Sequence, residues 1–251
     1  MNRKESKTRE EHLLLSCAVV VFLVSLAIRL AKLIVDPLIM RDCAVYLELA
    51  ENWYATGQYS VTLQSEHIIP PLPLFTIKEL MESGFSSEIC GRSLALFLGS
   101  SIPVLGFLGA YRIKKDNIFA ASIMAGILAV HPTLVAYACQ PLRENYYMFS
   151  MGLLFICVID AIKDRSRVKW MLCGVCCAIA FFCRYEAFEM FLILPVIMFF
   201  VGWKQHLPRP YCWKCLLFFW GAIAISMVLL LSMTKYDSTF LQKIQLYYHR
   251  F

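Results

Sequence analysis

Two carboxylates of this chain, Asp42 and Glu66, belong to a polar interruption, residues 41–75, that directly follows the first long apolar segment. Acidic groups at the edge of a bilayer are costly and are kept mainly where a function uses them. The interruption ends in the rigid run Pro70-Pro71-Leu72-Pro73, which favours a built site over a tether. We therefore predict a membrane enzyme whose chemistry is centred on this interruption.

Charged residues gather at two further points, each at an expected helix end. Arg143 and Glu144 follow the third apolar segment, and Arg184 and Glu186 follow the fifth. If the apolar segments form a bundle, these two points and the interruption can converge on a single cavity.

The elements that must position these residues are membrane helices. The chain is 59% hydrophobic and only 17% charged, which is typical of a polytopic membrane protein. Spanning helices need roughly 20 mostly apolar residues, and seven segments approach that length: Leu13–Val35, Arg92–Tyr111, Asn117–Pro132, Tyr146–Ile162, Val168–Cys183, Phe188–Trp203 and Lys214–Met233. The predicted fold is all-α and polytopic, with a transmembrane domain at 13–233 between a basic N-terminus (1–12) and an interfacial tail (234–251).

The distribution of Lys and Arg predicts the orientation of the chain. With seven helices threaded, the Lys and Arg residues before the first segment and those at 112–115, 163–169 and 204–214 lie on one side. The positive-inside rule makes that side cytoplasmic. The N-terminus is then cytoplasmic, and a catalytic loop of about residues 36–91 faces outward. The net charge of +6 is explained by topology, so no nucleic-acid partner is predicted.

The outer loop contains elements of its own. Residues 42–54 carry apolar side chains at helical spacing, which predicts an interfacial amphipathic helix that ends at Gly57. The prolines from Pro70 to Pro73 predict an extended segment, followed by a short helix at Phe75–Met81.

Eleven cysteines are present, and most lie within apolar segments, where Cys behaves as a small hydrophobe. Cys43, Cys90 and Cys139 lie on the predicted outer side and could pair there. Two CxxC spacings, Cys173/Cys176 and Cys212/Cys215, leave a four-thiolate zinc site as a remote alternative.

An ordered set of motifs covers nearly all of the chain: Asp42, Tyr46 and Ala50, then Gly57 and Tyr59, the proline run, His131-Pro132, Leu142-Arg143-Glu144 and Arg184-Tyr185-Glu186. In this order they resemble the N-terminal half of the GT-C glycosyltransferases, which include polyprenyl- and dolichyl-phosphate-sugar-dependent mannosyltransferases and aminoarabinose transferases. The resemblance implies an inverting transferase. It would move a sugar from a polyprenyl-phosphate carrier to a lipid, glycan or protein acceptor. Relatives are usually longer, so a fragment, a compact member and an inactive remnant are all left open.

The resemblance also implies roles for acidic residues. Asp42 matches the catalytic carboxylate of the first outer loop, and would be the general base that deprotonates the acceptor hydroxyl. A carboxylate at a partly desolvated rim suits this task; the alternative is that Asp42 caps the interfacial helix. Glu66, His67 and Glu144 are candidates for binding the acceptor or a divalent metal, with a solvated loop pair as the alternative for Glu66 and His67. No metal or other cofactor is predicted.

Three arginines at outer helix ends are candidates for binding the departing lipid phosphate, because a planar guanidinium can hold two phosphate oxygens: Arg92, Arg143 and Arg184. The alternative for each is snorkelling or pairing with a neighbour such as Glu144 or Glu186. Arg29 and Lys32, near the outer end of the first helix, are open to the same two interpretations.

Two other function classes are alternatives to the transferase. A non-catalytic partner of a larger membrane complex suits the short length. A lipid or solute transporter is less favoured, because the sequence shows no repeats and no discontinuous helices. A bacterial plasma membrane is the expected location.

Overall fold

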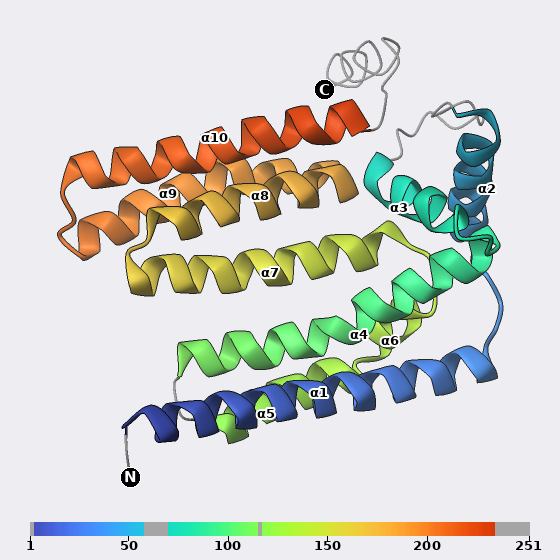
Figure 1. The fold of residues 1–251 in the computed structure, drawn as a ribbon, viewed down its shortest axis with the longest axis horizontal. Coiled ribbons are helices and arrows are strands. Elements are labelled where there is room, and N and C mark those ends of the chain that lie inside the picture. Colours follow the sequence, from blue (N-terminus) through green and yellow to red (C-terminus); the bar gives the residue numbers. More distant parts are fainter. Residues whose placement is uncertain (1–2, 58–69, 115–116, 234–251) are drawn as a thin grey trace.

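The computed structural model describes residues 3–57, 70–114 and 117–233, and within these ranges it contains helices and no strands. The longer helices run lengthwise (Figure 1): α1 (Arg3–Val35), α4 (Ser87–Ile113), α5 (Ile118–Val130), α7 (Arg143–Asp164), α8 (Arg167–Cys183), α9 (Phe188–Lys204) and α10 (Arg209–Met233). The all-α membrane fold is therefore confirmed. Among the described residues five helical segments are long and apolar enough to cross a membrane. The number is six if α5 and the short helix α6 (Pro132–Ala138), which form a bent pair, count as one span. The predicted seven spans are therefore not confirmed.

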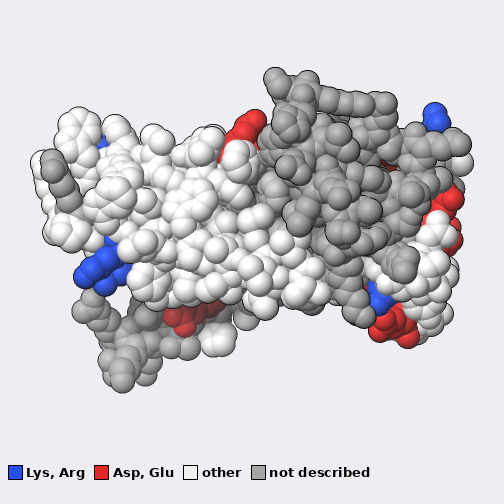
Figure 2. All heavy atoms as spheres, turned by 90° about the horizontal axis from the view of Figure 1, so that it is seen from above, with Lys and Arg blue, Asp and Glu red and all other residues white. Residues whose placement is uncertain are grey.

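The helices pack as a layered bundle. Helix α1 lies against α4 and α5, α4 against α7, α7 against α8, and α8 against α10 (Figure 1). On the face in Figure 2, most described side chains are neither acidic nor basic, as expected of a surface that faces lipid. Helix α1 begins at Arg3, within the predicted basic N-terminus (1–12), and continues through the first apolar segment.

The connections alternate between the two ends of the bundle. The start of α1 and the α4–α5, α7–α8 and α9–α10 connections, which carry most of the Lys and Arg residues, lie at one end (Figure 1); we call this the basic end. The connections that contain α2 (Arg41–Thr56), α3 (Pro71–Met81) and α6 (Pro132–Ala138) lie at the other, which we call the α2 end.

The third predicted segment, Asn117–Pro132, forms α5 and ends where predicted, but the short helix α6 follows it after a bend. Helices α5 and α6 meet at an angle of 61°. The break falls where Pro132 begins α6 and His131, with φ −59° and ψ 120°, is non-helical. A residue that precedes proline is disfavoured in the helical region, which explains the position of the break.

The predicted outer-loop helices form, with one correction. Helix α2 ends at Gly57, whose φ of +71° is left-handed and whose N–H donates to the Trp53 carbonyl, as predicted. The extended proline segment was wrong in part, because Pro71 and Pro73 lie inside the first turn of α3. The first N–H groups of a helix have no partner within it, so proline is tolerated there.

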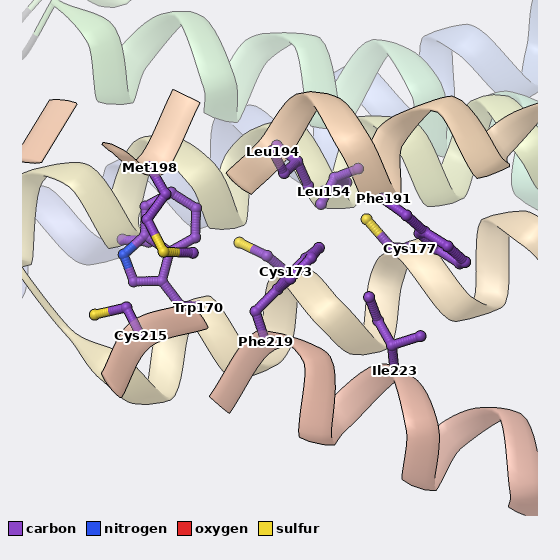
Figure 3. Packing of buried hydrophobic residues seen from close by; sticks show 11 residues of the cluster. Leu154, Trp170, Cys173, Cys177, Phe191, Leu194, Met198, Cys215, Phe219 and Ile223 are labelled. Atoms are coloured by element: carbon purple, nitrogen blue, oxygen red, sulfur yellow. The ribbon is translucent and has the colours of Figure 1, made fainter. Parts of the chain in front are cut away.

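The largest core cluster contains residues of the four helices α7, α8, α9 and α10 (Figure 3). Trp170, Cys173 and Cys177 of α8 pack there with Phe219 of α10. Gly174 permits the close approach of these helices, because an added Cβ would clash with the main-chain oxygen of Phe219. All eleven cysteines are free. Among the described residues no group of three or more His, Cys, Asp or Glu side chains is placed to hold a metal, so the conceivable zinc site does not form there.

Candidate functional site

The first site element is the start of α2. Met40 is the N-cap residue and no side chain caps the helix, while Asp42 lies in its first turn. The capping alternative for Asp42 is therefore wrong. Its side chain is exposed, so the described residues do not supply the partly desolvated rim expected around it.

The second element is the start of α7, where a carboxylate lies between two guanidinium groups. Glu144 Oε1 is 3.6 Å from Arg143 Nε and 3.9 Å from Nη1 of Arg184. Arg184 comes from the junction after α8, where its Nε is 3.2 Å from Glu186 Oε1. Its guanidinium also lies 5.7 Å from the ring centre of Tyr147, a cation–π distance.

Some polar atoms of this cluster remain without a hydrogen bond to the described residues. Arg143 Nε and Glu144 Oε2 are buried atoms that make no hydrogen bond to any described residue, and the same is true of Asn145 Oδ1. Such groups cost free energy until a partner satisfies them. A ligand that offers both hydroxyl donors and anionic acceptors would pair with this set.

The starts of α2 and α7 share one electrostatic neighbourhood. Burial raises the pKa of the Tyr46 hydroxyl to about 12, and the charges of Arg143, Glu144 and Asp42 all act on that hydroxyl. Burial likewise raises the pKa of the Cys43 thiol to about 12, with Asp42 and Glu144 adding to the effect. The structure therefore brings Asp42, Arg143, Glu144 and Arg184 to the same end of the bundle.

Arg92 is at this end but is already engaged. Its Nη2 donates to the Pro37 carbonyl at 2.6 Å, and its Nε pairs with Glu88 Oε1 at 2.8 Å. Pairing with a neighbour, one of the two interpretations of this arginine, is thus what is observed. Glu66, His67 and Tyr59 lie outside the described residues.

Sequence reasoning missed the polar side chains that join these elements. Gln140 donates to the Leu38 carbonyl and accepts from the Met40 N–H, and Asn145 donates to the Gln140 carbonyl. Gln140 belongs to no recognisable motif in the sequence, and its burial is visible only in the structure.

The snorkelling interpretation of Arg29 is wrong. It is 0% exposed, so it does not snorkel. Its Nη1 donates to Ser25 Oγ at 2.6 Å and to the Ala129 carbonyl at 3.3 Å. The pairing of Lys32 with Asp36 at 2.8 Å does fit a surface role for that lysine.

Comparison with known protein families, curated proteins and solved structures finds no match to this chain.

Proposed function

We propose that this chain is an inverting glycosyltransferase of the GT-C type, which moves a sugar from a polyprenyl-phosphate carrier to an acceptor hydroxyl. The observation that carries the proposal is the arrangement at the α2 end. An exposed carboxylate, Asp42, shares one neighbourhood with Arg143, Glu144 and Arg184. Inverting transfer to a hydroxyl requires a base on one side of the sugar and a cationic phosphate site on the other.

In the proposed reaction, Asp42 accepts the proton of the acceptor hydroxyl. The acceptor oxygen forms a bond to the anomeric carbon as the bond from that carbon to the phosphate oxygen breaks. The lipid phosphate leaves with the bonding electron pair, and Arg143 and Arg184 stabilise its charge. Attack opposite to the leaving group inverts the anomeric configuration. Exposure of Asp42 leaves it accessible to an acceptor that arrives from water.

Glu144 is proposed to bind the sugar or acceptor hydroxyls. Its Oε2 is buried and has no hydrogen bond to any described residue, so a hydroxyl donor would satisfy it. Glu66 and His67 keep their proposed acceptor role, and Arg92 is proposed to support the phosphate site from its place near the α1–α2 connection.

The proposed orientation places the α2 end outside the cytoplasm. The Lys- and Arg-rich connections gather at the opposite end (Figure 1), and such connections are retained in the cytoplasm. We propose a bacterial plasma membrane, with the carrier-linked sugar reaching Asp42 from the outer leaflet.

The test measures transfer of radiolabelled sugar from membrane polyprenyl-phosphate-sugars. It compares purified wild type with the variants Asp42→Asn and Glu48→Gln. Glu48 is an exposed carboxylate on the same helix and serves as the matched control. The proposal expects transfer by wild type and Glu48→Gln, loss in Asp42→Asn, and inverted anomeric configuration in the product. Sugar transfer by folded Asp42→Asn would show that Asp42 is not the catalytic base. Absence of transfer by wild type would favour a non-catalytic membrane partner.

A transporter is a second candidate, favoured by the bent helix pair α5–α6 and by buried Arg29. Transporters use discontinuous helices, and an ionisable residue inside the membrane is a functional candidate. Movement of unmodified carrier-linked sugar across proteoliposomes, lost in Arg29→Met and retained in Asp42→Asn, would support this function over transfer.

A further inference from the structure

The linker between α1 and α2, residues 36–40, is held by Gln140 from the connection between α6 and α7. Gln140, only 6% exposed, contacts it twice. Its Nε2 donates to the Leu38 carbonyl at 2.7 Å, and its Oε1 accepts from the Met40 N–H at 3.1 Å. Met40 is the N-cap residue of α2, so this contact acts at the point where the helix begins.

The main chain of Gln140 is fixed in turn by the start of α7. Asn145, 0% exposed, donates from Nδ2 to the Gln140 carbonyl at 2.9 Å and to the Tyr137 carbonyl at 2.8 Å. A continuous series of hydrogen bonds therefore runs from Asn145, through Gln140, to Met40. Asn145 follows Glu144 directly, and Met40 lies two positions before Asp42.

Glutamine suits this position because it offers one donor and one acceptor on the same planar group. Glutamate at Gln140 would lack the donor to the Leu38 carbonyl, and methionine would lack both groups at similar length. Asparagine is shorter by one methylene and would not reach from the same backbone.

We propose that Gln140 is a positioning residue, which fixes the start of α2 against the start of α7 and so sets where Asp42 lies relative to Arg143 and Glu144. The consequence for catalysis rests on the proposed transferase function; the structural role does not. A displacement of about 1 Å at a catalytic group can cost roughly 100-fold in rate, so a residue far from the sugar can control turnover.

The test combines hydrogen exchange with kinetics in Gln140→Met. Leu38 and Met40 are exposed residues, so their freed backbone groups can bond to water and the variant is expected to fold. Loss of one hydrogen bond predicts about tenfold faster exchange of the Met40 amide, with amides in the middle of α4 unchanged. With the arginines intact, kcat is expected to fall by roughly 10- to 100-fold while KM for the carrier-linked sugar is unchanged.

Two further variants make the result specific. Gln140→Glu keeps an acceptor for the Met40 N–H, so the amide should stay protected. Gln205→Met removes an amide at the basic end whose Oε1 has no hydrogen bond to any described residue, and should leave the linker unaffected. Unchanged Met40 exchange in folded Gln140→Met would overturn the proposal. If Gln140→Met does not fold, exchange of the Met40 amide in wild type as fast as in the unfolded chain would overturn the proposal.

The outcomes also separate this proposal from the proposed function. Absence of sugar transfer by wild type would reject the transferase, while the exchange rates would still decide whether Gln140 holds the linker. Faster exchange in Gln140→Met with unchanged kcat would reject the link between linker position and catalysis.

Discussion

Arg29 on α1 donates from Nη1 to the main-chain carbonyl of Ala129 at the C-terminal end of α5, at 3.3 Å. A fully buried cation thus meets the negative end of a helix dipole at the break between α5 and α6. Its Nε and Nη2 make no hydrogen bond to any described residue. Burial of an incompletely paired charge costs free energy, so stability alone does not account for this arginine.

The first prediction follows from this imbalance. Arg29→Met should fold and be at least as stable as wild type, because replacement of a buried ion by an apolar side chain of similar size is often neutral or stabilising by about 1–4 kcal/mol. Ser25→Ala should have the opposite effect, since it removes the 2.6 Å bond and leaves the charge in place, at a cost of about 1.5–3 kcal/mol. Thermal unfolding in detergent measures both. A large loss of stability in Arg29→Met would show that the arginine is mainly a structural contact.

How far the sequence predicted the structure depends on the range of the interactions involved. Helix α2 and its end at Gly57 follow from local spacing and backbone preference, and both were predicted. The first turn of α3 was missed because proline is read more readily as a helix breaker than as a helix start. The hydrogen bond from Arg29 to Ala129 joins residues that are one hundred positions apart, and no local pattern contains that information.

The same distinction holds at the site. Arg143, Glu144 and Arg184 were identified by their places at helix ends, but their mutual distances depend on how α7 and α8 pack. Gln140 has no local motif at all. Its role is visible only once the linker before α2 lies beside it.

The second prediction concerns the packing of α8 on α10. Gly174→Ala should destabilise the protein by about 1–3 kcal/mol, because the added Cβ would clash with the Phe219 main chain and lie 3.1 Å from the Ala222 Cβ. Gly126→Ala is the matched control, since nothing lies within 4 Å of the added Cβ. Equal unfolding temperatures of the two variants would contradict the close approach of these helices.

The third prediction uses the two neighbours Asp42 and Cys43. Cys43 is 0% exposed and burial raises its pKa to about 12, so at pH 8 almost none of it is thiolate, the reactive form. A membrane-impermeant maleimide should leave Cys43 unmodified and should label Asp42→Cys, whose position is exposed. Because the raised pKa keeps the thiol protonated, any labelling of Cys43 should increase as pH rises toward 12. Mass spectrometry of the peptide that spans residues 41–46 measures both sites, and rapid labelling of native Cys43 at pH 7 would show that α2 is not packed as described.

The last prediction tests Glu144 as an internal anion between two arginines. Its Oε1 lies 3.6 Å from Arg143 and 3.9 Å from Arg184, so its charge offsets theirs. Glu144→Gln removes this negative charge, so the two arginines should attract a phosphate more strongly. Binding of polyprenyl phosphate should tighten by about three- to tenfold. The effect is modest because the three side chains are 23–33% exposed, so solvent screens their charges. Glu186→Gln should have a smaller effect, since this carboxylate pairs only with Arg184 among the described residues and is 56% exposed.

Titration of the lipid phosphate against each variant at two salt concentrations measures the effect. The gain in Glu144→Gln should shrink as salt rises, because mobile ions screen partly exposed charges. Arg184→Gln provides the reverse change and should weaken binding. If Glu144→Gln binds phosphate more weakly than wild type, the carboxylate must orient Arg143 and Arg184 for the ligand, and orientation outweighs the charge that it removes.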